Sequence, residues 1–424
     1  MDERNVVTCF LRNDAAVLLL CRSEDVGSYR GQWGTVAGHA EGDPDAAARR
    51  EISEETGLDD AITLLRRGDP FAVEDPDRGT RWIVHPYLFE SDSRTVEPNW
   101  ETSDYEWVHP TEIRRRETVP DLWTSYDRVR PTVETIESDR QHGSAWLSIR
   151  ALEVLRDEAG GQAGDGETAP ADGPTEGWRT VARIARRLRD ARPSMPVVAN
   201  RVNGVMATAE RTPEDVERTA RDAIADALAA DQRAARTAAD RVPNRVVTLS
   251  RSGTVRAAIK QAEPNAVLVA ESRPGREGVG VAESLADETD VTLSSDAGLA
   301  WAIHEWDGQA VVVGADAIEP DGTVLNKVGT RVAALAANYE AIDVLVVAAV
   351  DKVASTGEID VEEVASSTLY EGDVDLSVAV PLFDKTPPDL VDLVATERGV
   401  VQTDEVAALA TRHREQATWD ETLS

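Results

Sequence analysis

The chain has 424 residues, 41% of them apolar, and this length favours two or three domains over a single core. It carries 78 acidic against 45 basic residues, a formal net charge of -33, and lysine is rare among the basic residues. An acidic, arginine-rich surface is typical of a protein that stays hydrated in concentrated salt, and it repels phosphate backbones. We therefore expect a halophilic protein that does not bind nucleic acid directly.

Cysteine content and the apolar runs indicate the compartment. Cys9 and Cys21 are too few for a disulfide framework, which fits a reducing environment. Residues 1–4 lack the basic and apolar regions of a signal peptide. The longest apolar runs are shorter than the roughly 20 residues that a membrane span needs. These features predict a soluble cytoplasmic protein without a membrane partner.

The first 130 residues combine strands with helices. Two apolar runs between Val6 and Leu20 flank the polar residues 12–14, which predicts a hairpin. A loop rich in glycine and tryptophan, a charged helix and further short strands follow. We assign residues 1–130 to one domain with a mixed sheet.

Residues 131–424 form the second predicted domain, which begins with a helical subdomain at 131–242. One of its helices is expected to start at Thr212 as N-cap, with Pro213 in the first turn. From 159 to 176 there are only Gly, Ala, Pro, Thr, Gln and acidic residues. We expect a flexible insertion without secondary structure there, because such a segment has almost nothing to bury.

The remaining residues, 243–424, alternate short apolar runs with helical stretches. The runs lie at 246–249, 266–270, 291–293, 310–313 and 344–350. Strands that are buried on both faces and alternate with helices are typical of a parallel, doubly wound sheet. The sequence therefore predicts an α/β protein whose last subdomain is Rossmann-like.

An acidic helix after the first hairpin is the strongest local signal. Asp43 is a suitable N-cap, Pro44 fits the first turn, and Gly57 can end the helix in the left-handed conformation. Helical spacing puts Glu51 and Glu55 one turn apart, with Glu54 adjacent to them. Three carboxylates on one side of a helix repel each other unless a cation with oxygen preference lies among them.

The residues from Arg50 to Leu58 resemble the second half of the Nudix box, Gly-x5-Glu-x7-Arg-Glu-U-x-Glu-Glu-x-Gly-U, where U is aliphatic. The first half differs, because Gly38 lies two residues too close to Arg50 and the sixth position is not glutamate. Glu41 or Asp43 would have to substitute for that glutamate.

The Nudix resemblance implies an α/β/α sandwich and hydrolysis of a nucleoside diphosphate linked to another moiety, such as a nucleotide sugar. It implies Mg²⁺, or Mn²⁺, as the cofactor that neutralises the diphosphate and activates water. The residues implied in catalysis and metal binding are Glu51, Glu54 and Glu55, with Gly38 in the metal site.

Three points stay open in this domain. The helix could be no more than a solvated acidic surface helix. The general base could be one of the helix glutamates or a loop acid such as Glu101 or Glu106. Trp33 could stack on a base, although packing in the core is the more common role of a tryptophan.

Polar residues follow each of the five predicted strands of the last subdomain. Because the carboxyl ends of parallel strands meet at one edge of a sheet, these residues are expected to form a ligand site. Each taken alone could be a turn or a helix cap. Arg273, Lys327 and Lys352 would supply cations for phosphate in a chain that otherwise hardly uses lysine.

Five motifs in this region, within 133–424, resemble the translation initiation factor 2B alpha/beta/delta family, whose fold is shared with ribose-1,5-bisphosphate and methylthioribose-1-phosphate isomerases. They are Thr-Leu-Ser-Arg-Ser (248–252), Glu-Ser-Arg-Pro-Gly (271–275), Gly-Ala-Asp-Ala-Ile (314–318), Asn-Lys-Val-Gly-Thr (326–330) and Phe-Asp-Lys-Thr-Pro-Pro (383–388). The ligand-binding residues implied for a phosphosugar or nucleotide are Ser250, Arg251, Glu271, Arg273, Asp316, Asn326, Lys327 and Lys352. The resemblance also implies a homo-oligomer formed through this domain.

The isomerases use a Cys/Asp pair, of which this sequence keeps one member. Asp316 matches the aspartate, whereas Ser250 stands at the cysteine and is a far weaker acid. His142-Gly143-Ser144 stands where the isomerases have Arg-Gly-Ala, so a phosphate ligand is lost. The sequence thus favours a phosphosugar or nucleotide sensor and makes isomerase activity doubtful.

Three functions compete. The first is a Nudix hydrolase fused to a phosphosugar-binding domain, and intact Glu51, Glu54 and Glu55 favour it. The second is a regulatory subunit that contacts initiation factor 2 and uses the Nudix fold only for docking. The third is an aldose–ketose isomerase of the ribose-1,5-bisphosphate type, against which Ser250 counts.

Overall fold

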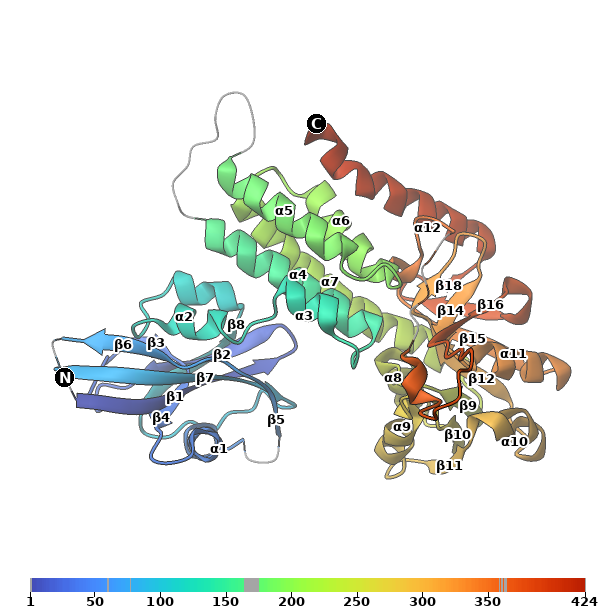
Figure 1. Ribbon diagram of the computed structural model, residues 1–424, viewed down its shortest axis with the longest axis horizontal. Coiled ribbons are helices and arrows are strands. Elements are labelled where there is room, and N and C mark those ends of the chain that lie inside the picture. The colour runs from blue at the N-terminus through green and yellow to red at the C-terminus, as the bar shows by residue number, and fades with distance from the viewer. Residues whose placement is uncertain are drawn as a thin grey trace. The chain divides into compact units, whose positions relative to one another are not determined.

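The computed structural model describes residues 2–423 except 59, 60, 77, 164–174, 358, 360, 362 and 363. The chain divides into two compact units, Met1–Thr132 with Arg156–Gly161, and Val133–Leu155 with Gln162–Ser424. Figure 1 shows both units with their elements labelled. Among the described residues, no helix is long and apolar enough to cross a membrane.

The first unit contains an eight-stranded mixed sheet. Its path runs β3-β2-β1-β7-β5, while β4 pairs with β1, β6 with β7 and β8 with β2. The strands are β1 (Asp2–Asn13), β2 (Ala16–Arg22), β3 (Trp33–Gly34), β4 (Val36–His39), β5 (Ile62–Arg67), β6 (Phe71–Asp75), β7 (Thr80–Ser91) and β8 (Thr102–Val108). The predicted hairpin is β1–β2, and β1 runs parallel to β7, so the predicted mixed sheet is confirmed.

Helices cover both faces of this sheet. Side chains alternate along β1, so Val7 and Cys9 pack against α1 (Pro44–Thr56), while Phe10 packs against α2 (Leu122–Asp127). In Figure 1 the two helices lie on opposite sides of the sheet. A short 3₁₀ helix, Pro110–Arg114, follows β8.

Local signals set the ends of α1 as the sequence predicted. The Asp43 carboxylate accepts a hydrogen bond from Asp45 N at 3.1 Å, and Pro44 occupies the first turn. Gly57 ends the helix with a φ of 70°, a conformation that glycine adopts without a steric penalty.

The second unit begins with helices, which Figure 1 shows packed side by side. They are α3 (Val133–Ser138), α4 (Ser144–Gln162), α5 (Glu176–Asp190), α6 (Pro196–Thr208) and α7 (Pro213–Ala239), and residues 156–161 of α4 group with the first unit. Thr212 caps α7 through a hydrogen bond from Asp215 N, as predicted.

The predicted insertion 159–176 is wrong at both ends. Residues 159–162 continue α4, where Ala159 is fully buried, because alanine favours the helix and its burial outweighs the local glycines. Thr175 is the N-cap of α5 and accepts from Trp178 N at 3.1 Å. Residues 164–174 lie outside the described part of the chain.

A seven-stranded sheet with the order β11-β10-β9-β12-β15-β17-β18 forms the rest of this unit. All neighbouring strands are parallel except the pair β17–β18. The strands are β9 (Arg245–Leu249), β10 (Ala266–Ala270), β11 (Asp290–Ser294), β12 (Ala310–Gly314), β15 (Asp343–Val347), β17 (Leu393–Thr396) and β18 (Gly399–Val401). The chain reverses its direction of travel across the sheet between β9 and β12, as in a doubly wound fold.

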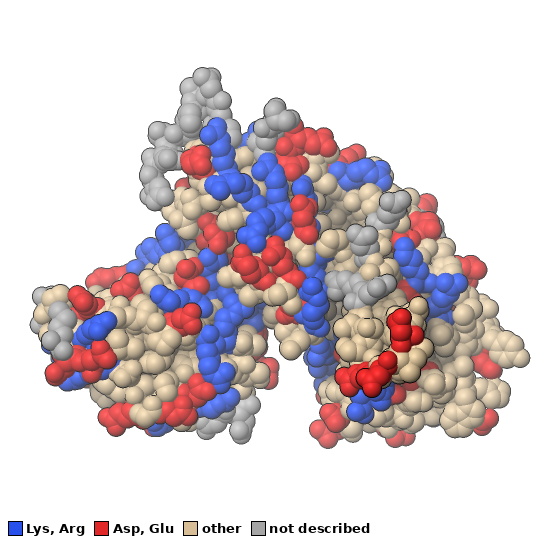
Figure 2. All heavy atoms as spheres, in the orientation of Figure 1, with Lys and Arg blue, Asp and Glu red and all other residues tan. Residues whose placement is uncertain are grey.

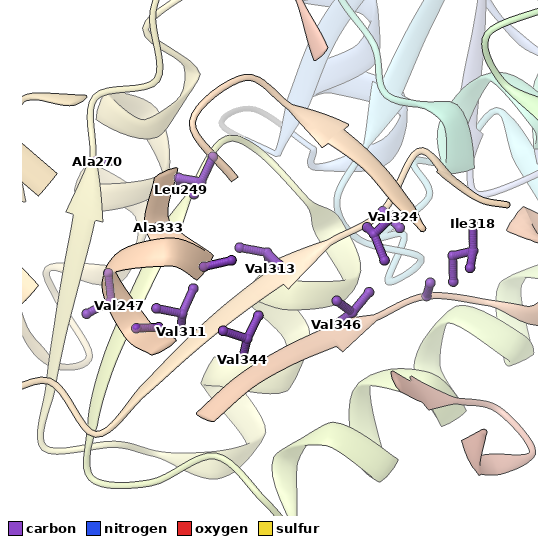
Figure 3. Close-up of a cluster of buried hydrophobic side chains, with 14 of the residues drawn as sticks. Val247, Leu249, Ala270, Val311, Val313, Ile318, Val324, Ala333, Val344 and Val346 are labelled. Atoms are coloured by element: carbon purple, nitrogen blue, oxygen red, sulfur yellow. The ribbon is translucent and has the colours of Figure 1, made fainter. Parts of the chain in front are cut away.

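Helices cover both faces of this sheet as well. The α/β fold class predicted from the sequence is confirmed. The helices are α8 (Gly253–Ala262), α9 (Glu277–Leu285), α10 (Leu299–Glu305), α11 (Thr330–Tyr339) and α12 (Thr403–Gln416). One apolar cluster joins the sheet to α10, α11 and α12, and another joins it to α7, α8 and α9. Figure 3 shows valines of β12 and β15 gathered near Ala333 of α11.

Two smaller features complete this unit. A three-stranded sheet has the order β13-β14-β16, with β13 (Ala317–Ile318), β14 (Val324–Lys327) and β16 (Phe383–Thr386). The apolar run predicted as a strand to Val350 ends instead at Val347, and a 3₁₀ turn at Val350–Lys352 follows. Figure 2 shows acidic and basic side chains interspersed on the visible face.

Candidate functional site

In the first unit, the carboxylates of Glu51 and Glu55 lie against the short strand β4. Glu55 Oε1 accepts a hydrogen bond from Ala37 N at 3.2 Å. Gly38 lies directly against Glu51, and a Cβ atom at this glycine would overlap the Glu51 carboxylate. Arg50 donates to Glu51 Oε1 at 2.8 Å and to His39 O at 3.3 Å. Helix α1 and strand β4 thus hold the two carboxylates close to β4.

Glu55 is buried, with 7% of its surface exposed. The pKa of Glu55 is raised to about 8, mainly by burial and also by the Glu101 and Glu51 carboxylates, against the opposing effects of the Ala37 N–H and Arg22. Glu101 therefore lies close enough to act on Glu55. A cation bound among Glu51, Glu55 and Glu101 would offset the repulsion between their carboxylates.

The third helix glutamate differs from the other two. Glu54 is exposed, and among the described residues no group of three or more His, Cys, Asp and Glu side chains is arranged to hold a metal ion. Glu41 is exposed too, and Asp43 is engaged as the helix cap. The structure thus brings Glu51 and Glu55 together beside Gly38 without Glu54.

The two loop acids proposed as general base have different surroundings. Glu101 sits in a turn where its N–H donates to Asn99 Oδ1 at 2.9 Å and its carbonyl accepts from Ser23 N at 2.7 Å. Glu106 instead forms a 2.5 Å ion pair with Arg116. Of these two loop acids, Glu101 is the one that acts on the pKa of Glu55.

Trp33 packs rather than standing free for a ligand. It is half-buried against the apolar cluster around α2, and the Arg116 guanidinium lies 4.5 Å from the centre of its ring. Its backbone also pairs with residues 117–119. These contacts favour the packing role that we expected for this tryptophan.

In the second unit, Ser250 and Asp316 follow β9 and β12, the two strands between which the strand order reverses. Ligands bind at this position in open α/β sheets, because the loops on either side diverge there. Ser250 has a φ of 64°, and its N–H donates to Ser272 Oγ at 2.6 Å. The hydroxyl of Ser272 thus joins the ends of β9 and β10.

Asp316 lies between a hydroxyl and a buried ammonium group. Ser144 Oγ donates to Asp316 Oδ1 at 2.8 Å from the start of α4. Lys352 is buried and donates to Ala315 O. Burial lowers the pKa of Lys352, and the carboxylates of Asp316 and Asp231 oppose this shift.

The other cations of the predicted site have protein partners. Lys327 Nζ contacts Glu277 Oε1 at 2.7 Å with 5% of its side chain exposed, and Arg273 lies 3.3 Å from Glu271. Arg251 donates to Gln141 O. A phosphate would have to compete with or replace these contacts.

The side chain of Asn326 orders the backbone turn before α11. Its amide donates to Thr330 Oγ1 at 2.9 Å, and Thr330 donates to Lys327 O at 2.7 Å, which fixes the turn that leads into α11. Asp384 of β16 accepts from Gly329 N at 2.8 Å at the same turn.

Sequence reasoning missed two functional contacts. Ser144 was noted only as part of a lost phosphate-binding motif, yet it contacts Asp316. Asp296, one of the polar residues that follow the strands, accepts from Ser272 N at 2.8 Å and Arg273 N at 2.6 Å and so orders the loop after β10. Neither contact has a local signal, because its partners lie far apart in the sequence.

Family models match both units. The model of the Initiation factor 2 subunit family matches residues 140–403, and the NUDIX domain model matches residues 2–129. Both resemblances drawn from the sequence are therefore confirmed.

Relatives of the second unit carry the name methylthioribose-1-phosphate isomerase. The protein of Xylella fastidiosa (strain 9a5c) is 35% identical over 172 residues, which cover 37% of this chain and 48% of that protein. The protein of Pseudomonas putida (strain GB-1) is 37% identical over 169 residues, covering 37% and 47%. The chain spans about half the length of these curated relatives. Their names do not support the doubt about isomerase activity that Ser250 raised.

Solved structures resemble the second unit too. Translation initiation factor eIF-2B of Pyrococcus horikoshii OT3 is 25% identical with a TM-score of 0.55, covering 63% of this chain and 94% of that chain. The 5-methylthioribose 1-phosphate isomerase of the same organism is 20% identical with a TM-score of 0.51, covering 67% and 86%. The latter likeness concerns the fold alone.

Proposed function

Because the chain belongs to the Initiation factor 2 subunit family and carries a NUDIX domain, we propose that its first unit hydrolyses a nucleoside diphosphate linked to another moiety. The observation that carries this proposal is the buried Glu55 carboxylate beside Glu51 and Glu101. A NUDIX domain supports hydrolase activity, and divalent metals are the general cofactor of such hydrolases.

Glu55 and its acidic neighbours offer oxygen ligands to a divalent cation. The Glu51 and Glu101 carboxylates raise the pKa of buried Glu55, and a hard cation with oxygen ligands would offset this repulsion. Glu51 and Glu55 would hold Mg²⁺ or Mn²⁺, with exposed Glu54 available from the next position on α1. The cation supplies charge neutralisation on the diphosphate and a more acidic water.

Side chains of the protein would accept the proton and balance the charge of the diphosphate. Glu101, held by Asn99 and Ser23, can accept a proton from the attacking water. Arg22 lies near Glu55 and can balance negative charge on a diphosphate. Phosphoanhydride cleavage then yields two phosphorylated products.

For the second unit we propose binding of a phosphosugar at the ends of β9 and β12. Asp316, positioned by Ser144 and near Lys352, would contact sugar hydroxyls, and the cations around it would meet the phosphate after exchanging their present partners. The names of the relatives favour aldose–ketose isomerisation as a second candidate function, with Asp316 transferring the proton. A nucleotide sugar would link the halves, since its cleavage releases a sugar phosphate.

The test is turnover of a nucleotide library by the full-length protein with Mg²⁺ in high salt. We expect Glu55→Gln to abolish release of phosphorylated product while leaving the circular dichroism spectrum unchanged. Glu74→Gln, on the exposed part of β6, is the matched control and should retain activity. Equal turnover by wild type and Glu55→Gln would refute the catalytic role of Glu55. No turnover of any nucleotide by the wild type would refute the hydrolase proposal and favour a docking role, including contact with initiation factor 2.

Isomerisation is tested separately. Wild type and Asp316→Asn are incubated with ribose-1,5-bisphosphate and with methylthioribose-1-phosphate, and the ketose product is measured. Product formed by the wild type and lost in Asp316→Asn supports an isomerase. Binding of either sugar without conversion supports a sensor.

A further inference from the structure

Three aromatic side chains gather on the sheet of the first unit, outside the carboxylate site. The ring centres of His39 on β4 and Trp82 on β7 are 5.9 Å apart with an interplanar angle of 59°. Tyr29, from the loop after β2, reaches the same part of the sheet, because its hydroxyl donates to Asp75 of β6, the strand that pairs with β7 at Trp82. Burial and this hydrogen bond raise the pKa of Tyr29 to about 12. We call Tyr29, His39 and Trp82 the aromatic cluster.

Polar contacts hold the tyrosine of the cluster in place. Its hydroxyl donates to Asp75 Oδ2 at 2.6 Å, and the Arg78 guanidinium lies 5.2 Å from the centre of its ring. Arg78 in turn pairs with Asp75 at 3.3 Å and donates to Gly27 O at 3.3 Å. The loop that carries Tyr29 is thus tied to the β6–β7 hairpin.

The aromatic cluster is adjacent to the carboxylate site. His39 directly follows Gly38, against which the Glu51 carboxylate lies. Arg50 joins the two places, since it donates to both His39 O and Glu51 Oε1. At its other end, the loop of Tyr29 is fixed to Arg22, which donates to Ser28 O at 2.9 Å and acts on Glu55.

The cluster also has rings that a ligand can reach. His39 is exposed, and Tyr29 and Trp82 are only partly buried. Trp33, by contrast, is packed under Arg116. A surface aromatic group beside a diphosphate-binding edge suits the planar face of a nucleobase, because stacking does not require a matching hydrogen-bond pattern.

We propose that Tyr29, His39 and Trp82 bind the base of the nucleotide while its diphosphate lies at Glu51 and Glu55. This inference rests on the proposed hydrolysis of a nucleoside diphosphate derivative. Under this inference, the aromatic cluster makes the first unit bind nucleotides more tightly than diphosphates without a base. The competing explanation is that the cluster only stabilises the loop of Tyr29.

Equilibrium binding separates these explanations without requiring turnover. The probes are ADP and inorganic pyrophosphate with Mg²⁺ in high salt, titrated into the full-length protein. We expect the wild type to bind ADP more tightly than pyrophosphate. His39→Ala should weaken ADP binding roughly tenfold, the range of one lost stacking contact, and leave pyrophosphate binding unchanged. His85→Ala is the matched control, because His85 lies on the same strand as Trp82 and contacts Asn5 instead.

Tyrosine variants provide a second check. Tyr29→Phe keeps the ring and should retain ADP affinity, whereas Tyr29→Ala should lose it with an unchanged melting temperature in the presence of pyrophosphate. Equal affinity of the wild type for the two probes, or an equal loss of both in His39→Ala, would overturn the inference. Selective ADP binding through His39 with no hydrolysis of any nucleotide would instead refute the proposed reaction and leave the base-binding role standing.

Discussion

Ser144 Oγ lies 2.8 Å from Asp316 Oδ1, a hydrogen bond between residues that are 172 positions apart in the chain. It fixes the start of α4 to the loop after β12, where the order of the sheet reverses. Ser144 lies in the segment that stands where the isomerases have a phosphate-binding motif. Here its hydroxyl supports the Asp316 carboxylate.

Replacing Ser144 should disturb this carboxylate more than the fold. Ser144→Ala removes a hydrogen bond to a charged group, a contact worth roughly 1.5–3 kcal/mol. We expect phosphosugar binding, measured by calorimetry, to weaken by about tenfold or more. Ser284→Ala in α9, which removes a hydroxyl bonded to Val281 O, should leave binding unchanged. Equal affinities for Ser144→Ala and wild type would contradict the supporting role.

Gly38 gives a steric test of the carboxylate site. Gly38→Ala places a methyl group where the Glu51 carboxylate lies, so the flexible side chain of Glu51 must move while the backbone stays. A displacement of about 1 Å at a catalytic group can cost roughly 100-fold in rate. We therefore expect a loss of that size in kcat with little change in melting temperature. Gly27→Ala is the control, because nothing lies within 4 Å of the added carbon.

The pH dependence of stability should report on Glu55. Its pKa is about 8 in the folded, metal-free protein against an ordinary value of 4.5. Because the folded state binds this proton more tightly, the stabilisation is fully present below pH 4.5 and is lost as pH rises through 8. Urea unfolding of wild type in EDTA should therefore show a fall in stability between these values that Glu55→Gln lacks. Parallel curves for the two proteins would show that Glu55 does not titrate in this range.

The acidic surface predicts a dependence on salt. At a net charge of -33, self-repulsion extends over a Debye length of about 10 Å at 0.1 M salt and about 3 Å at 1 M. Melting temperature and hydrolysis should both fall as KCl is lowered. A maximum of either quantity in dilute KCl would contradict the halophilic interpretation.

A deletion shorter than the insertion predicted at 159–176 tests the segment between α4 and α5. Gln162 and Gly177 are in contact, with a Cβ at Gly177 3.4 Å from Gln162 Cβ, so the helix ends that flank the segment lie close together. Deleting residues 164–174 while keeping the cap Thr175 should leave the melting temperature unchanged across the KCl series, since closing a shorter loop costs little. A drop of several degrees would show that these residues pack against the helices.

Local chemistry explains what the sequence could predict. Asp43, Pro44 and Gly57 mark the ends of α1 because each acts on backbone within a few residues of itself. The parallel sheet follows from apolar runs of strand length, and the strand ends then place Ser250 and Asp316 at one edge. Nothing local distinguishes buried Glu55 from exposed Glu54, because their difference comes from the fold around β4.

Contacts over long separations explain the rest. The aromatic cluster needs β4, β7 and the loop after β2 to be placed first, so no spacing rule finds it. The ion pair between Lys327 and Glu277 joins residues 50 positions apart and gives a protein partner to a cation that the sequence assigned to phosphate. The glycines at 160 and 161 suggested a break that the neighbouring packing of α4 overrides.

Lys327 and Lys352 are both buried in a chain whose exposed cations are nearly all arginine. A preference for arginine over lysine on an acidic surface depends on contact with water. It therefore does not apply to buried side chains. At these two positions a compact ammonium group fits beside Glu277 or Asp316, where a planar guanidinium is larger and needs more partners. Arginine should therefore be tolerated in place of Lys260 and Lys385 but not in place of Lys327 or Lys352.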